Sequence, residues 1–391
     1  MSILSVPVYM DYSATTPCDE RVVDAMLPYF TRFFGNTASR IHSYGWQAEA
    51  AVELAREQVA QIIHAQPKEI VFTSGATEAC NLALRGVVEL YAVKGNHIIT
   101  TKTEHKAVLD TCKALEKKGA IITYLDVDAN GLIDLTALEQ SITPSTILVS
   151  IMLANNETGV VQNVAEIGKI CKQHKVLFFC DATQAVGKIP IDVLASEIDL
   201  LAFSSHKIYG PKGVGALYIR SRNPRVKIAP QITGGGHENN LRSGTLNVTG
   251  IVGFGKACSI CMEELSTEQE RLTRLRDRLK DGLLQIPNTT LNGHPSQRLP
   301  NVLNISFPPL NSGLLLSALN KSIALSSGSA CTSGSLDPSY VLSAMGIDDT
   351  HARAALRFSI GRFTTEEEID FAIREVNEKV TQLRNEGMFI G

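Results

Sequence analysis

A lone cysteine, Cys331, lies in the segment SSGSACTSGS (residues 326–335), where every neighbouring side chain is small. A structural cysteine is usually packed as a small buried hydrophobe, whereas a Gly/Ser-rich segment resembles a flexible tether with nothing large to pack around the sulfur. Thiolate is the reactive form of such a group. The segment therefore indicates a presented thiol and not a packed one.

Three further polar side chains follow apolar runs that read as buried strands. Lys207 comes after AFSS, and a lysine whose pKa is lowered by burial and nearby positive charge can form a Schiff base. Asp181 ends VLFFCD, where a half-desolvated carboxylate is best tolerated opposite a cation such as a protonated pyridine nitrogen. His105 follows HIITT and could stack on a ring or shuttle protons. The ordinary alternatives are a surface lysine, a turn cap and a polar loop residue.

A fourth candidate is FTSGATEACN (72–81), in which a strand ends in Ser-Gly-Ala-Thr before a helix. Free backbone N–H groups, the helix dipole and the Thr77 hydroxyl would make an anion site suited to a phosphate. A simple N-cap by Ser74 or Thr77 explains the same pattern equally well. No dinucleotide or Walker-type glycine motif is present, and the histidines have no metal-ligand spacing, so the sequence predicts no metal site.

The elements that must position these residues alternate between short apolar runs and amphipathic stretches from about residue 69. This alternation predicts an α/β domain with a mostly parallel sheet, in which the carboxyl ends of the strands meet at one edge. DLLAFSS (199–205) and GVGALYIR (213–220) follow each other without a helix. We therefore expect one antiparallel strand at that end of the sheet.

A long helical pattern from about Val248 to Ile286 leads to a second, smaller α+β unit. Thr365 and Glu368 form a capping box that predicts the start of the last helix. We expect a large domain over residues 16–262. Residues 1–15 and 263–391 would form the small domain, which carries Cys331.

Composition narrows the function classes. The chain has 391 residues and a net charge of -3, which provides no basic field for direct nucleic-acid binding. The N-terminus lacks a signal pattern and no run approaches a membrane span, so we expect a cytoplasmic protein with no membrane contact. Eight cysteines without framework spacing favour reduced thiols, including the pair in CSIC (258–261).

The chain resembles the NifS/IscS-type cysteine desulfurases of the class V aminotransferase family, from YMDYSATTP near residue 9 to GRFTTEEEID near residue 370. The segments that carry the resemblance are VFTSGATE, TKTEHKAVLDTC, NNETGVVQ, DATQAVGK, SSHKIYGPKGVGALY, GGGHENNLRSGT and SSGSACTSGSLDPSYVL. The resemblance implies the fold type I architecture of aspartate aminotransferase and pyridoxal 5'-phosphate as the cofactor.

The same resemblance implies a role for each motif. Lys207 would hold the cofactor covalently, Asp181 would pair with its ring nitrogen, Gln184 would bond the ring hydroxyl, and His105 would stack over the ring. The implied phosphate ligands are Ala76, Thr77, Ser204 and His206, together with Thr245 from a second subunit.

Asn156 and Arg357 would hold the substrate, Asn156 at the cofactor and Arg357 through a planar fork that suits a carboxylate. The implied reaction converts L-cysteine to L-alanine. Lys207 would remove the Cα proton, and the Cys331 thiolate would take the sulfur and carry it as a persulfide. His105 is the candidate proton acceptor, since a free cysteine has a pKa of about 8.5.

The implied partners are a second copy of the chain in a homodimer and sulfur-acceptor proteins for iron–sulfur cluster assembly or tRNA thiolation. Ser205 replaces the glycine common in the family's S-G-H-K motif, which we expect to leave the lysine's role intact. The chain ends at LRNEGMFIG, so we expect no scaffold docking through a longer tail. The alternatives are a selenocysteine lyase, another fold type I enzyme such as an aminotransferase, and a non-catalytic sulfur-relay protein. The Cys331 segment favours desulfuration, and the intact Lys207, Asp181 and His105 disfavour a loss of catalysis.

Overall fold

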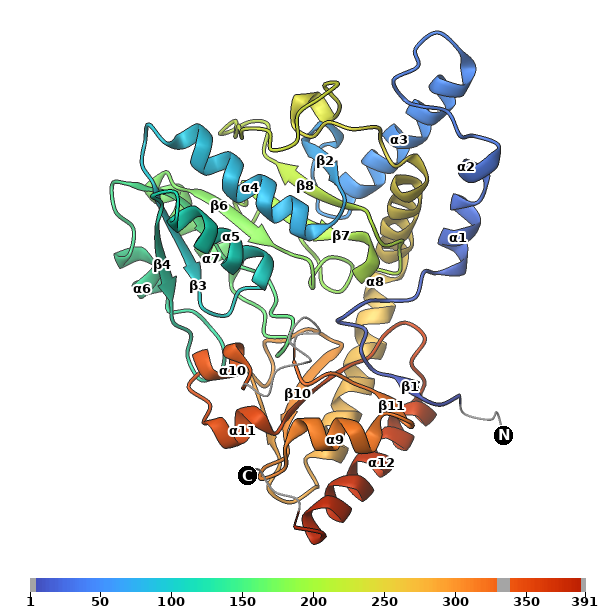
Figure 1. Ribbon diagram of the computed structural model, residues 1–391, viewed down its shortest axis with the longest axis vertical. Helices are drawn as coiled ribbons and strands as arrows, with labels where there is room; N and C mark the ends of the chain where they lie inside the picture. The colour runs from blue at the N-terminus through green and yellow to red at the C-terminus, as the bar shows by residue number, and fades with distance from the viewer. Residues whose placement is uncertain (1–4, 329–337, 388–391) are drawn as a thin grey trace.

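The computed structural model describes residues 5–328 and 338–387, and its largest element is a seven-stranded sheet (Figure 1). The strand order is β2-β8-β7-β6-β5-β3-β4, and β8 alone runs in the opposite direction to the other six strands. The bounds are β2 Ile70–Thr73, β3 His97–Thr101, β4 Ile121–Leu125, β5 Thr146–Ser150, β6 Leu177–Asp181, β7 Leu200–Ser204 and β8 Gly215–Ile219. The predicted parallel α/β sheet and its one antiparallel strand are confirmed.

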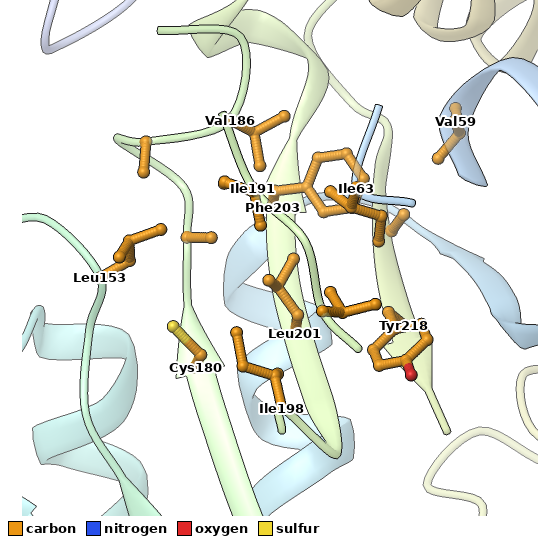
Figure 2. Close-up of a cluster of buried hydrophobic side chains, with 14 of the residues drawn as sticks. Val59, Ile63, Leu153, Cys180, Val186, Ile191, Ile198, Leu201, Phe203 and Tyr218 are labelled. Carbon is orange, nitrogen blue, oxygen red and sulfur yellow. The ribbon is translucent and has the colours of Figure 1, made fainter. Parts of the chain in front are cut away.

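Helices cover both faces of this sheet because its strands are apolar on both sides. In β7, Leu201 and Phe203 face one core while Leu200 and Ala202 face the other. Figure 2 shows the first core, where Leu201 and Phe203 lie among side chains from several elements. The covering helices are α3 Ser43–Gln61, α6 Leu135–Gln140, α7 Val164–His174 and α8 Val248–Leu283 on the first face, and α4 Ala76–Tyr91 and α5 Lys106–Glu116 on the second.

The smaller part of the molecule is built on a three-stranded antiparallel sheet of order β12-β10-β9. A two-stranded parallel pair, β1 with β11, brings the N-terminal segment to the same part of the chain. Its strands are β1 Val8–Tyr9, β9 Thr290–Leu291, β10 Val302–Ser306, β11 Ile323–Ala324 and β12 Ala355–Ser359, and its helices are α9 Ser312–Leu319, α10 Tyr340–Ala344, α11 Asp349–Arg353 and α12 Glu366–Asn385. The capping box predicted at Thr365 and Glu368 is present at the start of α12.

The long helix α8 joins the two parts, as Figure 1 shows. Its first half, around Phe254, packs into the core of the large sheet, and its second half, around Leu279, packs into the core of the small one. The chain segment between β1 and α3, which contains α1 Glu20–Met26 and α2 Pro28–Thr31, also connects the two parts. Short 3-10 turns complete the described chain: Pro67–Glu69, Ser205–Lys207 and Glu238–Asn240.

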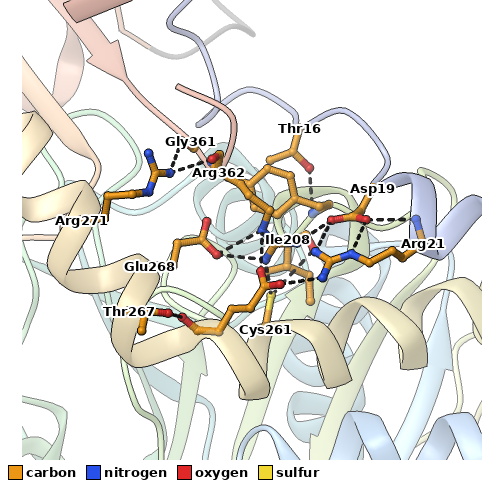
Figure 3. A network of polar contacts seen from close by, with 12 residues as sticks. Thr16, Asp19, Arg21, Ile208, Cys261, Thr267, Glu268, Arg271, Gly361 and Arg362 are labelled. Carbon is orange, nitrogen blue, oxygen red and sulfur yellow. Dashed lines mark hydrogen bonds and ion pairs between the residues drawn. The ribbon is translucent and has the colours of Figure 1, made fainter. Parts of the chain in front are cut away.

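A buried ionic network fixes this junction (Figure 3). The guanidinium of Arg362, which follows β12, lies 2.9 Å from Asp19 and 3.0 Å from Glu268 of α8. It also lies 4.3 Å from the centre of the Tyr209 ring. Arg21 and Arg362 hold the pKa of Asp19 well below its usual range. The network therefore ties the N-terminal segment, the large sheet and the small sheet to one point.

Candidate active site

A pocket of about 510 Å³ opens at the carboxyl ends of the parallel strands, as expected for an α/β sheet. Five strands deliver residues to it within a few positions of their ends, and the N-terminal segment and β12 close it from the other side. The sequence-predicted residues that line it are Ala76, Thr77, His105, Asn156, Asp181, Gln184, Ser204, His206, Lys207 and Arg357. Motifs more than 100 residues apart in the chain therefore share one cavity.

Lys207 lies in the 3-10 turn directly after β7, and its amine points to the N-terminal segment. The Nζ atom donates to the carbonyl oxygens of Ser13 and Ala14, at 2.5 and 2.7 Å. Burial lowers the pKa of Lys207 to about 7, helped by the positive charges of Lys188 and Arg357 and opposed by nearby carboxylates. An amine with this pKa is partly uncharged at neutral pH and can act as a nucleophile or a base.

Asp181 and Gln184 face the pocket from the end of β6. The Oδ1 atom of Asp181 accepts the Thr183 N–H at 2.9 Å, so the predicted turn cap is present while the residue still lines the cavity. The Gln184 amide donates to the Ser13 carbonyl at 3.0 Å. Its Oε1 atom is buried without a hydrogen-bond partner among the described residues, as is the Thr183 hydroxyl. Unpaired buried acceptors are costly, so these atoms fit a ligand that supplies hydroxyl or N–H donors.

His105 is the N-cap of α5 and one wall of the pocket. Its Nδ1 atom accepts the backbone N–H of Ala107 at 3.1 Å, which leaves Nε2 as the nitrogen that is not committed to the backbone. Burial lowers the pKa of His105, and the positive charge of Lys207 lowers it further, although Asp181 opposes both. Burial and the charge of Lys207 therefore favour the uncharged form of the ring.

The phosphate candidate lies at the N-terminus of α4. The N-cap is Gly75, with φ of +155°, and no capping hydrogen bond from its side chain is possible. The predicted alternative, a cap by Ser74 or Thr77, is wrong because the helix begins at Ala76 with Gly75 as its N-cap, and no side chain caps it. The Ser74 N–H donates to the Glu78 carboxylate at 2.8 Å. The first N–H groups of α4 remain available for an anion. The Lys212 side chain, also in the lining, adds positive charge.

His206 and Ser204 complete this wall. The Nδ1 atom of His206 lies 3.1 Å from the Thr15 hydroxyl. Burial, and then the positive charges of Lys207, Lys212 and Lys188, lower the pKa of His206 to about 4. A neutral imidazole here can donate one hydrogen bond to a phosphate without adding charge.

Arg357 enters from β12 and is almost completely buried. Its guanidinium bonds the Asp11 carboxylate at 2.6 Å and the Asn156 carbonyl at 2.9 Å. The Nε atom of Arg357 and the Oδ1 atom of Asn156 have no partner in the part of the chain that is described. A donor and an acceptor at one end of the pocket suit the carboxylate and amino groups of an amino acid.

Two predicted residues are not found in the lining of this pocket, for different reasons. Thr245 lies between β8 and α8 and is absent from the lining among the described residues. Cys331 lies outside the described residues. Sequence reasoning missed Ser13, Ala14 and Thr15, although YMDYSATTP was among the segments that carried the family resemblance. A role for backbone carbonyl oxygens leaves no residue-type signal.

These groups define a class of protein. A partly uncharged buried lysine, a carboxylate at the next strand end, a neutral histidine and an open helix N-terminus form the arrangement with which proteins hold a pyridoxal cofactor. In the described chain, no cluster of His, Cys, Asp and Glu could hold a metal ion. No described helix is long and apolar enough to cross a membrane.

The comparisons with known proteins identify the family. The family model for class-V aminotransferases matches residues 8–371. "Cysteine desulfurase IscS" of Pectobacterium atrosepticum is 55% identical over 98% of this chain and 95% of its own length, and the same-named protein of Histophilus somni is 56% identical over the same shares. A solved "NifS-like protein" superposes with a TM-score of 0.90 at 40% identity, over 97% of this chain and 100% of its own. The chain belongs to the class-V aminotransferase family, and its cofactor is pyridoxal phosphate.

Proposed function

We propose that the protein is a cysteine desulfurase, which converts L-cysteine to L-alanine and transfers the sulfur to Cys331 as a persulfide. The observation that carries the proposal is the position of Lys207. Its amine is buried in the strand-end pocket with a pKa lowered to about 7, in the same cavity as Asp181, His105 and Arg357. The relatives that match almost the whole chain bear the name of this activity.

The pocket fits the cofactor at each end. Lys207 would hold it covalently, Asp181 would face the ring nitrogen, Gln184 the ring hydroxyl, and the α4 N-terminus the phosphate. When bound, pyridoxal phosphate supplies an electron sink for the negative charge left by loss of the Cα proton. Arg357 binds the substrate carboxylate and so places the Cα proton within reach of the Lys207 amine, which takes it as the general base.

The sulfur then leaves the substrate for the enzyme. The Cys331 thiolate attacks the substrate sulfur, so that an S–S bond forms, the C–S bond breaks and alanine is the second product. The balance is one cysteine and one thiol in, one alanine and one persulfide out. His105 is placed beside the reacting groups, and because its Nδ1 atom accepts the Ala107 N–H, the proton of the neutral ring is on Nε2, which can donate it there.

The test uses the purified protein loaded with pyridoxal phosphate. L-cysteine is added with a reductant, and sulfide and alanine are measured for the wild type, Lys207→Ala and Cys331→Ala. Lys207→Ala should lose both the visible absorbance of the bound cofactor and turnover. Cys331→Ala should keep the absorbance and lose sulfide release. Desulfuration by Cys331→Ala at the wild-type rate would retire the persulfide assignment, and a preference for selenocysteine would favour the lyase alternative.

We further propose that the active unit is a homodimer in which Thr245 completes the phosphate site of the partner subunit. Two observations support this. Thr245 is not among the residues that line the pocket of its own chain. The segment from α1 to α3 exposes several large apolar side chains, which mark an interaction surface: Leu27, Phe30, Phe34, Ile41, Tyr44 and Trp46. Light scattering should give twice the chain mass, and Thr245→Val should weaken cofactor retention without changing that mass.

A persulfide has to be handed on, so the proposed partners are sulfur-acceptor proteins, either an iron–sulfur scaffold or a carrier for tRNA thiolation. All seven cysteines in the described part of the chain are unpaired. Free thiols persist in a reducing compartment, which supports a cytoplasmic location. Transfer of labelled sulfur from the loaded enzyme to each purified acceptor class distinguishes the two.

A further inference from the structure

Glu157 is a buried carboxyl group that none of the roles above uses. It follows Asn156 in the loop after β5 and is 1% exposed. Its backbone N–H donates to the Asn155 side chain at 2.9 Å, and its carbonyl oxygen accepts from Asn304 of β10 at 3.4 Å. The residue is therefore fixed next to Asn156 of the pocket lining, between the large sheet and the small one.

On one side, the Glu157 carboxyl group holds the start of α10. The Ser339 hydroxyl donates to Oε2 of Glu157 at 2.5 Å and accepts the Leu342 N–H at 3.3 Å as the helix N-cap. The next residue, Tyr340, donates its hydroxyl to the Glu104 carbonyl at 2.8 Å. The Lys106 ammonium lies 4.3 Å from the centre of the Tyr340 ring. The start of α10 is thus attached, at two consecutive residues, to the segments that follow β5 and β3.

On the other side, the same oxygen lies against Gly328. A Cβ atom built on Gly328 would be 3.0 Å from Oε2 of Glu157, and the φ angle of +151° disfavours any other residue. Gly328 is also tied to Ser326, whose hydroxyl donates to its carbonyl at 2.9 Å. Ser326 in turn accepts the backbone N–H of Arg357 at 2.8 Å. One carboxyl group therefore contacts both chain positions.

These two positions delimit the stretch of chain that contains Cys331. Cys331 is three positions after Gly328, a length over which a polypeptide spans at most about 11 Å. Ser339 is eight positions after Cys331. The place of Gly328 is therefore the tighter constraint on the thiol, and Glu157 sets that place from beside Asn156, which lines the pocket.

We propose that Glu157 is a positioning residue for sulfur transfer: next to Asn156 of the pocket lining, its carboxyl group binds Ser339 and packs against Gly328, and so fixes the two points between which Cys331 is tethered. The inference rests on the proposed function, because it requires Cys331 to be the sulfur acceptor. It adds a residue that touches neither cofactor nor substrate. Loss of the Glu157 carboxyl group should therefore slow the transfer of sulfur to Cys331. A displacement of about 1 Å at a reacting group can cost roughly 10²-fold in rate.

The test compares Glu157→Ala, Glu157→Gln and Ser339→Ala in the cofactor-loaded protein. Ser343→Ala, an exposed serine on the same helix, is the matched control. Persulfide on Cys331 is followed by mass spectrometry in a single turnover, alongside the cofactor absorbance and the KM for L-cysteine. Glu157→Ala should slow persulfide formation about 10- to 100-fold with unchanged absorbance and KM. Glu157→Gln and Ser339→Ala should slow it less, because each keeps part of the contact, and Ser343→Ala should match the wild type.

A second measurement separates this inference from the proposed function. Hydrogen exchange of the backbone at residues 326–328 and 339–342 should rise in Glu157→Ala and Ser339→Ala and not in Ser343→Ala. If the wild type forms no persulfide on Cys331, the proposed function fails while the exchange result still reports on the anchor. Wild-type transfer rates in both Glu157→Ala and Ser339→Ala would overturn the inference. If Glu157→Ala does not fold, the rate of persulfide formation in Ser339→Ala tests the inference, because this variant removes the other partner of the same hydrogen bond.

Discussion

The two walls of the pocket are built in different ways. On the strand-end wall, Asp181 and His105 are held by their own neighbours, through the N–H groups of Thr183 and Ala107 two residues further on. On the opposite wall, contacts join residues that are far apart in the chain. Arg357 and Asp11 are separated by 346 positions, and Lys207 and Ser13 by 194.

This difference assigns different tasks to the two walls. The strand-end wall supplies the groups that change charge or bind covalently, because every parallel strand ends at the same edge and offers a side chain there. The opposite wall supplies carbonyl oxygens and a buried ion pair that orient those groups. The first wall therefore sets which chemistry is available, and the second sets where the amine and the guanidinium point.

The largest effect is expected from a substitution in the strand-end wall. Asp181→Asn keeps the shape of the side chain and removes the charge opposite the ring nitrogen, so turnover of L-cysteine should fall about 10²- to 10³-fold, as for loss of one preorganised electrostatic group. Cofactor content, measured by absorbance, should stay near the wild-type level. Asp126→Asn, at an exposed pair with Lys102, is the control and should leave turnover unchanged. Turnover in Asp181→Asn close to the wild-type rate would contradict the division between the walls.

The next largest effect is expected at the buried ionic network of Arg362, which fixes the junction between the two parts of the molecule. Arg362→Ala removes the cation that Asp19 and Glu268 share at the junction, so that Asp19 keeps only the half-exposed Arg21. Loss of one partner of a buried ion pair costs about 3–5 kcal/mol. The free energy of unfolding of the cofactor-free protein, from denaturant titration, measures it.

Arg274→Ala is the matched control for the junction, because its pair with Glu366 is exposed. It should change the free energy of unfolding by less than about 1 kcal/mol. Equal losses for the two arginines would show that burial at the junction does not decide the stability of the pair.

The residues of the strand-end wall could be predicted from the sequence, because the pattern that marks a strand end is local. An apolar run followed by a polar residue predicts a strand end, and Lys207, Asp181 and His105 were found in this way before any family was named. The choice between a phosphate site and an N-cap at Ser74 and Thr77 stayed open. It depended on which residue is the N-cap of α4, and the residue pattern does not show that this is Gly75.

The contacts of the opposite wall could not be predicted from the sequence, for a physical reason. Carbonyl oxygens of Ser13 and Ala14 act through the backbone, so their residue types carry no signal. Arg357 was recognised through its family motif, but its partner Asp11 was not, because pairing across the whole chain is fixed by β1, β11 and β12 and not by spacing. Glu157 shows the same limit, since Gly328 and Ser339 meet it only in the folded chain.

The smallest effect is expected from Lys188, which lies behind the strand-end wall and acts on the pKa of Lys207. Lys188 is buried, bonds the Gln184 carbonyl at 3.0 Å, and shares a narrow cavity with Lys207. Its positive charge helps to lower the pKa of Lys207 to about 7, after burial itself. Lys188→Met removes that charge and keeps the bulk, so the charged form of Lys207 becomes easier to reach and its pKa should rise by about one unit.

The sign of this change is measurable without turnover. In the cofactor-free protein, an amine-directed reagent labels Lys207 only when the amine is uncharged, so wild-type labelling should be half-maximal near pH 7 and rise above it. In Lys188→Met the profile should move to higher pH, and labelling at pH 7 should fall several-fold. Lys188→Arg keeps the charge and should keep the wild-type profile. Because Arg357 and the carboxylates of Asp11 and Asp181 also act on Lys207, an unmoved profile in Lys188→Met would assign the tuning to burial and to the opposite wall.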